Sequence, residues 1–430
     1  EICACLVGSE MCIRDRDNDM RFNTALLHGD FRGDKNTGAT QTPIYQSSAF
    51  EHASAETLEK IFNNMAPGFS YSRISNPTIE AFEKRMTVLE GGVASVACSS
   101  GMAAITNAFT NILQSGDEIV CSASLYGGSI DLFRDLESFG IKTHYVNNND
   151  VEQFRAATNE NTKLYFAETI GNPRLDVTDI RLIADEAHRA GVPFIVDNTV
   201  ATAYLIKPIE YGADIVVNST SKYVNGNSNS ISGVITDSGN FKWDIIKYPG
   251  MKDFKKYGPY AYTAKLRNGI YRNTGACLSP QNAFYNILGM ETLGIRMERV
   301  CSNAMTLAKY LNDNYGNLSV NYPGLENSEF YNIAKKELNN GFGGIITIRT
   351  GSKEKAFKFI NALQIPLNVS NIGDTKTLVI HPSSTISAHS TEEEKKIAGV
   401  YDDLVRISVG IEDVQDPVSY THLTLPTTPY

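Results

Sequence analysis

The chain has 430 residues, of which 42% are hydrophobic and 20% charged, an ordinary composition for a globular protein with room for two domains. Its formal net charge of −9 disfavours a nucleic-acid or anionic-membrane partner. No apolar run approaches the roughly 20 residues that a transmembrane helix needs. We therefore expect a cytoplasmic protein.

The cysteines and histidines show no metal-binding pattern. Cys98 and Cys121 lie in apolar runs, where a reduced and buried thiol is the expected state. No pair of cysteines has metal-ligand spacing. The histidines at positions 28, 52, 144 and 188 also lack a partner at such spacing, so we expect them to have surface or packing roles and expect no metal site.

The two ends differ in character from the rest of the chain. Residues 1–19 lack the basic start and the small-residue cleavage site of a secretory signal. Together with residues 417–430, they resemble translated adapter sequence more than protein. We expect both ends to be non-native, place the natural start at Met20, and expect the last helix to be truncated.

Residues 20–75 contain few helix-period runs and many turn residues, which indicates an extended arm that reaches a neighbouring subunit. At the end of the arm, Tyr71 and Arg73 place a phenol and a guanidinium two residues apart. The planar guanidinium suits a phosphate. A surface arginine in a loop before a helix explains this stretch equally well.

Strand-like and helix-like stretches alternate from residue 94 to about residue 237, which predicts a mostly parallel sheet with helices on both faces. No Gly-x-Gly-x-x-Gly motif and no P-loop follows these strands, so a nicotinamide Rossmann site and a P-loop site are disfavoured. The expected strands are 94–98, 117–121, 142–146, 163–169, 193–197 and 213–217, and the expected helices are 79–90, 102–113 and 179–189.

The remainder predicts a smaller α+β domain. Past Gly239 we expect a loop around Trp243 and Pro249, followed by a long helical region over 279–315. The stretches 344–349 and 377–380 are strand-like, 353–363 is helical, and the domain closes with residues 404–412. We therefore divide the chain into a leader (1–19), an arm (20–75), a large domain (76–270), a small C-terminal domain (271–416) and a tail (417–430).

Two strands end in groups that suit pyridoxal 5'-phosphate (PLP) chemistry. Lys222 follows the strand 213–217 across a hydroxyl-rich turn, and Asp197 ends the strand 193–197. Chemistry in α/β proteins gathers at such strand ends. A PLP enzyme needs a lysine to hold the aldehyde as a Schiff base and an acid to keep the pyridine nitrogen protonated. Both groups are therefore candidates for this site.

Two further turns suit the same cofactor. Ser100 and Gly101 open a helix after a strand, so free N–H groups there could hold a phosphate, although most such turns only cap a helix. Tyr126 precedes Gly127 and Gly128, which suits a ring lying flat against a cofactor. A core tyrosine beside a turn is the alternative.

Seven motifs in order resemble the PLP-dependent enzymes of cysteine and methionine metabolism, the group of cystathionine γ-synthase, γ-lyase and O-acetylhomoserine sulfhydrylase. The resemblance spans about residues 20–415. The motifs are Tyr71-Ser72-Arg73 with Asn76-Pro77-Thr78, Ser99-Ser100-Gly101-Met102, Tyr126-Gly127-Gly128, Glu168-Thr169 with Asn172-Pro173, Asp197-Asn198-Thr199, Ser219-x-Ser221-Lys222-Tyr223, and Arg406-x-Ser408-x-Gly410-x-Glu412.

The resemblance implies the type I PLP-dependent transferase fold and a role for each motif residue. Lys222, Tyr126 and Asp197 would be catalytic, as the Schiff-base lysine, the stacking ring and the pyridinium partner. Arg406, Asn371 and Tyr71 would bind the substrate, with Arg406 clamping its α-carboxylate. Further cofactor contacts would come from Asn172, Thr199, Ser100, Gly101, Met102, Ser219 and Ser221, and from Tyr71 and Arg73 of a neighbouring subunit. The resemblance thus implies a homodimer with shared sites, commonly paired into a homotetramer.

Within this family the chain most resembles the O-acetylhomoserine sulfhydrylases. Residues 271–284 are similar to their R-D-x-G-A-x-x-S-P-x-N-A-F pattern, with Asn273 in place of the acid, and 371–378 are also typical of that branch. The methionine γ-lyase branch usually carries a cysteine where Gly128 stands. Two departures are Gly226-Asn227, where many relatives have Gly-His, and Ile386-Ser387, where Thr-His is expected. They concern pocket contacts and leave the cofactor set intact.

The resemblance implies a γ-replacement in which an O-acylated homoserine, O-acetylhomoserine above all, reacts with sulfide or methanethiol to give homocysteine or methionine. Cystathionine γ-synthase and the γ-elimination lyases that act on cystathionine or methionine are the alternatives. An inactive scaffold with the same fold is a third hypothesis, disfavoured by the intact Lys222, Asp197 and Arg406.

Overall fold

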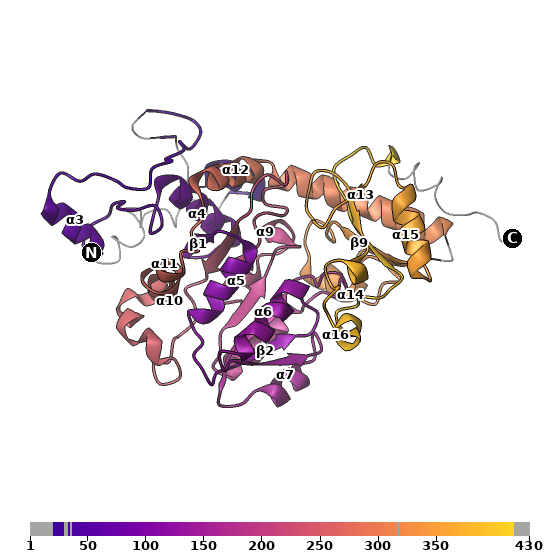
Figure 1. The fold of residues 1–430 in the computed structure, drawn as a ribbon, viewed down its shortest axis with the longest axis horizontal. Coiled ribbons are helices and arrows are strands. Elements are labelled where there is room, and N and C mark those ends of the chain that lie inside the picture. Colours follow the sequence, from indigo (N-terminus) through magenta and orange to yellow (C-terminus); the bar gives the residue numbers. More distant parts are fainter. Residues whose placement is uncertain (1–19, 30–32, 35–36, 316–317, 417–430) are drawn as a thin grey trace.

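The computed structural model describes residues 20–29, 33–34, 37–315 and 318–416 (Figure 1). The predicted leader, the tail and the truncation expected for the last helix lie outside these residues. A large sheet occupies the middle of the molecule, and a smaller sheet lies beside it toward the C-terminus. This arrangement confirms the predicted mostly parallel sheet with a smaller C-terminal domain, while the exact domain boundaries remain a prediction.

The large sheet has seven strands in the order β1-β7-β6-β5-β4-β2-β3. The five strands from β6 to β3 are parallel, and β7 runs antiparallel to both of its neighbours, β1 and β6. The strands are β1 (Ala94–Cys98), β2 (Glu118–Ser122), β3 (Lys142–Val146), β4 (Thr162–Glu168), β5 (Phe194–Asp197), β6 (Ile215–Asn218) and β7 (Gly233–Asp237).

Helices pack on both faces of this sheet, as predicted. Local signals set their ends: Asn76 caps α4, which ends at Gly91 in the left-handed conformation (φ 76°), and Asp179 caps α8. The helices before and around the large sheet are α2 (Phe22–His28), α3 (Ala55–Phe62), α4 (Pro77–Glu90), α5 (Gly101–Thr110), α6 (Gly127–Glu137), α7 (Val151–Ala157), α8 (Ile180–Arg189), α9 (Thr202–Leu205), η2 (Pro208–Tyr211), η3 (Pro249–Tyr260), α10 (Ala261–Asn268) and α11 (Ile270–Thr274).

Alternate residues of the strands supply two separate hydrophobic cores. Tyr165 and Ala167 of β4 face the core that α4, α8 and α12 (Pro280–Glu291) cover, whereas Leu164 and Phe166 face the core under α5, α6 and α10. Side chains of a strand point alternately to the two faces, so a sheet covered on both sides is apolar throughout. This explains the continuous apolar runs in the sequence.

The small sheet has five strands in the order β10-β11-β12-β9-β8. The helix α13 (Leu293–Asn314) connects it to the large sheet, because Met297 and Val300 lie in a core of the large sheet and Leu307 and Leu311 lie in the core of the small one. The remaining elements are β8 (Ser319–Asn321), α14 (Tyr331–Glu337), β9 (Ile345–Arg349), α15 (Lys353–Ala362), β10 (Leu367–Asn368), β11 (Leu378–Ile380), η4 (Pro382–Ser384), α16 (Glu392–Ile397) and β12 (Leu404–Ser408).

The structure refines three local predictions. The predicted helical region 279–315 is confirmed, and it consists of two helices that meet at Thr292. The expected loop after Gly239 contains the 3-10 helix η3, which continues into α10. The expected extended arm also carries the short helices α2 and α3, and Figure 1 shows α3 projecting away from the sheets.

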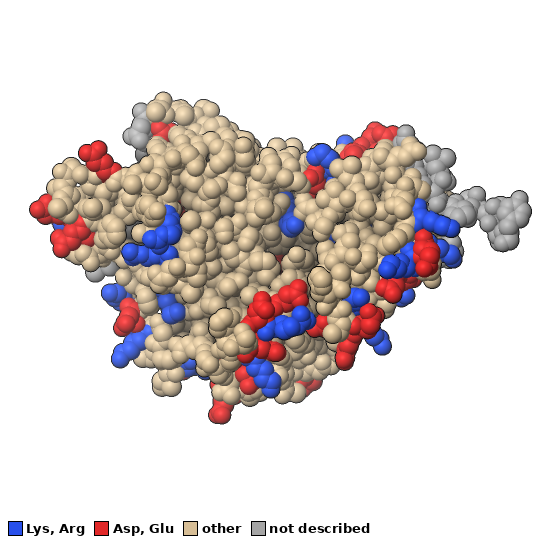
Figure 2. All heavy atoms as spheres, in the orientation of Figure 1, with Lys and Arg blue, Asp and Glu red and all other residues tan. Residues whose placement is uncertain are grey.

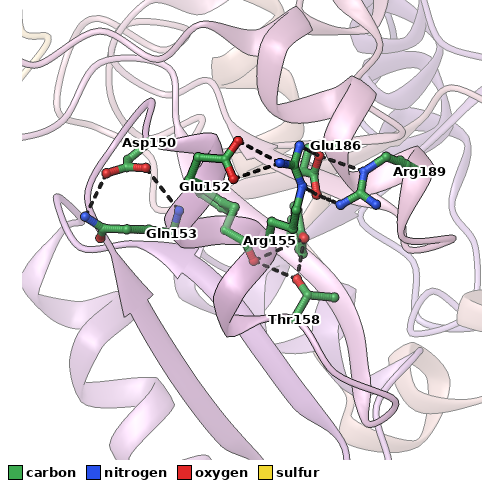
Figure 3. Close-up of polar contacts among 9 residues, drawn as sticks. Asp150, Glu152, Gln153, Arg155, Thr158, Glu186 and Arg189 are labelled. Carbon is green, nitrogen blue, oxygen red and sulfur yellow. Dashed lines mark hydrogen bonds and ion pairs between the residues drawn. The ribbon is translucent and has the colours of Figure 1, made fainter.

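A group of charged side chains connects α7 and α8 through ion pairs (Figure 3). The buried Glu186 carboxylate of α8 binds Arg155 of α7 at 3.0 Å and also binds Arg189. Arg155 additionally binds Glu152 at 2.6 Å. Chiefly because Arg189 donates hydrogen bonds to it, the pKa of Glu186 lies below its usual value. These contacts lie on α7 and α8 and stabilise the packing of the two helices.

A buried arginine holds the turn that follows Lys222. Arg296 of α13 donates to the carbonyl oxygens of Tyr223 (2.6 Å), Val224 (3.1 Å) and Gly289 (2.7 Å). Burial lowers the pKa of Arg296 to about 10. The guanidinium therefore links the lysine turn to the junction of α12 and α13.

We expect the Arg296→Met variant to lose about 3 kcal/mol or more of unfolding free energy, because three buried carbonyl groups lose their donor. Denaturant unfolding of the purified protein measures this loss. Arg299 is exposed on the same helix, so Arg299→Met is the matched control and should change stability by less than about 0.5 kcal/mol. Equal losses in the two variants would contradict the assigned role of Arg296.

Candidate active site

The C-terminal ends of the parallel strands meet at one edge of the large sheet. Here β4 ends at Glu168, β5 at Asp197 and β6 at Asn218, and Lys222 follows in the next turn. Figure 2 shows the molecule hollowed between its two lobes. The structure thus places the candidate acid and the candidate amine on neighbouring strands at one sheet edge.

The Lys222 amine is hydrogen-bonded and partly buried. Its Nζ donates to Oδ1 of Asn371 at 2.6 Å. Burial, and then the positive charge of Arg406, lower the pKa of Lys222 to about 8. A lysine with this pKa is a much better base near neutral pH than an ordinary one.

Arg406 lies in the middle of β12 and is 3% exposed. Its Nη1 donates to Oδ1 of Asn172 at 3.1 Å, and its Nη2 donates to the carbonyl oxygen of Asn371 at 3.0 Å. Burial lowers its pKa to about 10. Its Nε has no hydrogen-bond partner, and no carboxylate in the described part of the chain pairs with it. A buried cation of this kind requires an anion, and a carboxylate fits its planar fork.

Asp197 and Glu168 form a pair of adjacent carboxyl groups at the ends of β5 and β4, with Glu168 buried and Asp197 partly buried. Asp197 accepts a hydrogen bond from the backbone N–H of Thr199 at 2.9 Å, and burial raises its pKa to about 6. Burial, followed by the charge of Asp197, raises the pKa of Glu168 well above its usual value. Both carboxyl groups therefore favour the neutral form more than they would in water.

The Tyr126 ring lies against Gly128. A Cβ atom added to Gly128 would lie 2.5 Å from Cε1 of Tyr126 and 3.3 Å from Sδ of Met102. The backbone N–H of Tyr126 donates to Oε1 of Glu168 at 2.5 Å, and the side chain is 41% exposed. Glu168 thereby connects the tyrosine with Asp197.

The Ser100–Met102 turn packs closely on the turn that carries Ser219. The Ser100 hydroxyl caps α5, and a Cβ atom on Gly101 would lie 2.6 Å from Cβ of Ser219. Ser219 donates its N–H to Oγ1 of Thr199 at 2.8 Å, which ties this turn to the end of β5. The Ser221 hydroxyl bonds to the backbone of Ser232. The Ser100 hydroxyl accepts from the N–H of Ala103, which leaves the N–H groups before Ala103 without partners within the helix and suited to an anion.

Tyr71 and Arg73 contact other parts of the same chain. The Arg73 guanidinium donates to the carbonyl oxygen of Arg272 at 2.6 Å and lies 5.5 Å from the centre of the Tyr71 ring. Tyr71 pairs with Ala49 in the arm and is 43% exposed. The contacts of these two residues are therefore with the arm and the 272–275 turn, whereas Lys222, Asn371, Arg406 and Asn172 form one connected group.

The sequence analysis missed Glu90, a buried carboxyl group beneath the site. Glu90 accepts hydrogen bonds from Nδ2 of Asn218 at 2.8 Å and from Nδ2 of Asn198 at 3.3 Å. These amides adjoin Ser219 and Asp197, respectively. Burial raises the pKa of Glu90 to about 7. A carboxyl group at the end of an apolar helix face was the available signal, but it was interpreted only as the end of a helix.

The remaining sequence expectations concern cysteines, metals and membranes. Cys98 and Cys121 are buried and free, as predicted. Over residues 20–29, 33–34, 37–315 and 318–416, no group of three or more His, Cys, Asp or Glu side chains is placed to hold a metal ion. Within the same ranges, every helix is too short or too polar to cross a membrane.

The residues at this edge fit PLP. Asp197 supplies a negative charge for a pyridinium nitrogen, and Tyr126 presents an open ring face. The backbone at Gly101 leaves no room for a side chain, as a turn that cradles a phosphate requires. The partly buried Lys222 amine has a lowered pKa, which suits attachment to an aldehyde. Fold and site together define a PLP-dependent enzyme of the type I fold.

The chain belongs to the Cys/Met metabolism PLP-dependent enzyme family, which it matches over residues 23–419. It is 42% identical to an O-acetyl-L-homoserine sulfhydrylase of Corynebacterium glutamicum over 93% of this chain and 95% of the relative. It is 40% identical to a homocysteine synthase of Schizosaccharomyces pombe over 93% of this chain and 96% of the relative.

A solved structure shares the fold. The chain superposes on a Campylobacter jejuni enzyme that contains N'-pyridoxyl-lysine-5'-monophosphate, with a TM-score of 0.89 and 31% identity. The match covers 94% of this chain and 99% of the other. The predicted family and fold class are therefore confirmed.

We expect Glu90→Gln to gain stability relative to the unchanged protein as the pH rises. The unfolded chain releases the Glu90 proton from about pH 4.5, whereas the folded chain holds it until about pH 7, so the stability of the unchanged protein falls across this window. Across this window the free energy of unfolding falls by about 3 kcal/mol. Melting temperatures of both cofactor-free proteins between pH 5 and pH 8 measure the difference. A difference in melting temperature between the two proteins that stays the same at every pH would show that Glu90 ionises normally.

Proposed function

We propose that the protein catalyses γ-replacement on an O-acylated homoserine, O-acetylhomoserine above all, with sulfide or methanethiol. The Cγ–O bond breaks and the acyl group leaves as acetate, while a new Cγ–S bond gives homocysteine or methionine. The contact chain Lys222–Asn371–Arg406 carries this proposal, because it holds a base beside a buried cation suited to an α-carboxylate. The names of the relatives from Corynebacterium and Schizosaccharomyces support the same reaction.

Each residue of the group has a proposed role. PLP, when bound, supplies an electron sink for the reacting amino acid. Asp197 balances the charge of the ring nitrogen, and Tyr126 covers the ring. The Lys222 amine removes and returns protons at Cα and Cβ of the substrate, and Arg406 orients its α-carboxylate. Asn172 and Thr199 are further proposed cofactor contacts, and Ser100, Gly101, Met102, Ser219 and Ser221 are the proposed phosphate cradle.

A γ-elimination lyase is the second candidate, and two features favour the transferase. The Tyr126 ring occupies the space that a Cβ atom at Gly128 would need, so a cysteine there, as in the methionine γ-lyase branch, requires a different ring position. Residues 371–378, which resemble the sulfhydrylase branch, supply the Asn371 contact with Lys222. A cystathionine γ-synthase would perform the same type of γ-replacement with a different thiol.

We also propose a homodimer with shared sites, paired into a homotetramer, located in the cytoplasm. The arm (20–75) would bring Tyr71 and Arg73 to the phosphate and the substrate of the neighbouring subunit, while domains 76–270 and 271–416 form the rest of each site. The exposed Tyr71 ring supports this proposal. Recovery of the enzyme in the membrane fraction of its producing cells would contradict the assigned location.

The reaction is tested by measuring acetate release from O-acetylhomoserine with and without added sulfide. We expect release that depends on sulfide and equals homocysteine formation, and we expect loss of at least about 1,000-fold in Lys222→Ala because the base is removed. O-succinylhomoserine and O-phosphohomoserine serve as competing esters. Ketoacid and ammonia release without sulfide would instead establish the lyase.

Shared sites are tested by mixing two inactive variants. Tyr71→Ala removes the residue that the arm brings to the neighbouring site, and Lys222→Ala removes the base from the chain's own site. A dimer of one chain of each kind should therefore contain one site with both residues intact. We expect activity to return to about a quarter of the unchanged level, the statistical share of intact sites after random exchange of subunits. Each variant incubated alone is the control. No recovery after verified subunit exchange would mean that each chain forms its site alone.

A further inference from the structure

A continuous hydrogen-bond chain leads away from the Lys222 amine. Lys222 Nζ donates to Oδ1 of Asn371 at 2.6 Å, and Nδ2 of Asn371 donates to Oγ of Ser228 at 2.9 Å. The Ser228 hydroxyl in turn donates to Oδ2 of Asp374. The chain therefore runs from the candidate base, through one amide and one hydroxyl, to a buried carboxylate.

The direction of these bonds is fixed at both ends. Burial opposes ionisation of Asp374, but hydrogen bonds from Ser228 and from the backbone and side chain of Lys376 outweigh it, so the pKa of Asp374 lies below its usual value. An ionised carboxylate only accepts, so Ser228 must donate to it and is left to accept from Asn371. A lysine ammonium only donates. The oxygen of the Asn371 amide consequently faces Lys222.

The backbone at Ser228 indicates that its hydroxyl is needed. Ser228 has a φ of 54°, in the left-handed region where glycine is favoured. A serine there costs free energy unless its side chain makes a compensating contact. The neighbouring backbone is also tied to the Asp374 loop, because Thr375 donates its N–H to the carbonyl oxygen of Gly226 at 2.8 Å. The contact between Ser228 and Asp374 is thus held by both loops.

Asn371 reaches both functional groups at once. Its side chain contacts Lys222, and its carbonyl oxygen accepts from Arg406 at 3.0 Å. Rotation of the amide would place its NH₂ group against the lysine amine and lose the bond, while the backbone contact with Arg406 would stay. The amide orientation therefore affects the base separately from the carboxylate clamp.

We propose that Ser228 and Asp374 are positioning residues for Lys222: they fix the Asn371 amide so that its oxygen holds the lysine amine. The proposal rests on the proposed function only in taking Lys222 as the base. Ser228 directly follows Gly226-Asn227, where the chain departs from the Gly-His of many relatives, and Asp374 lies in the 371–378 segment typical of the sulfhydrylase branch. The proposal therefore gives a role to residues from both segments.

The first test measures the pKa of Lys222 in the full-length, cofactor-free chain. Competitive acetylation with acetic anhydride from pH 6 to pH 10, followed by peptide mass spectrometry, reports this value. We expect Ser228→Gly to lower the pKa of Lys222 by about one unit, because a hydrogen bond to the charged form is lost. Asp374→Asn should shift it in the same direction.

The second test compares kcat with KM in the holoenzyme. In Ser228→Gly we expect kcat to fall about 10-fold to 100-fold because the base is misplaced. The rising limb of its pH profile should move to lower pH together with the Lys222 pKa. KM for the ester should change little, since Arg406 keeps its contacts. The melting temperature should stay constant or rise, because glycine relieves the backbone at position 228.

Asn340→Gly is the matched control. Asn340 also has a positive φ, 61°, and is exposed, so its replacement relieves a similar backbone without touching Lys222. It should leave both the Lys222 pKa and kcat unchanged. An unaltered Lys222 pKa in both Ser228→Gly and Asp374→Asn would overturn the proposal, as would parallel losses of stability and kcat without a pKa shift. Because acetylation of the cofactor-free chain does not depend on the reaction, failure of the proposed function would show separately, in the sulfide assay.

Discussion

The hydrogen bonds of Arg406 are the contacts on which the site depends. They join β12 of the small sheet to Asn172 beyond β4 of the large sheet and to Asn371 before β11. The acceptors of these bonds are uncharged carbonyl oxygens, so they do not balance the positive charge of Arg406. The guanidinium is therefore a buried cation that favours an anionic ligand. The residue that joins the two sheets is therefore also the residue that we propose to bind the substrate carboxylate.

The sequence contained the parts of the site that are set locally. Lys222 and Asp197 follow apolar strands, and the parallel arrangement of those strands brings their ends together, so both could be placed at one edge from pattern alone. Asn172, Asn371 and Arg406 are different, because 234 residues separate Asn172 from Arg406. No local pattern predicts such a contact, and only the family resemblance singled out these residues.

The errors have physical explanations as well. The segment of η3 contains Pro249, Gly250, Gly258 and Pro259, and this composition is typical of a loop even where the chain turns with 3-10 geometry. Glu90 was missed for the opposite reason: a carboxyl group in a helix usually faces water. The structure buries it because two asparagine amides, each next to a predicted cofactor residue, supply its hydrogen bonds.

Burial acts on the charged groups of this site in opposite directions. It raises the pKa values of Asp197, Glu168 and Glu90 and lowers those of Lys222 and Arg406, so each group is biased toward its neutral form. A ligand with a positive ring nitrogen beside Asp197 and a carboxylate beside Arg406 reverses the bias at both positions. Binding and ionisation are then coupled, because each ligand charge stabilises the protein charge that binds it.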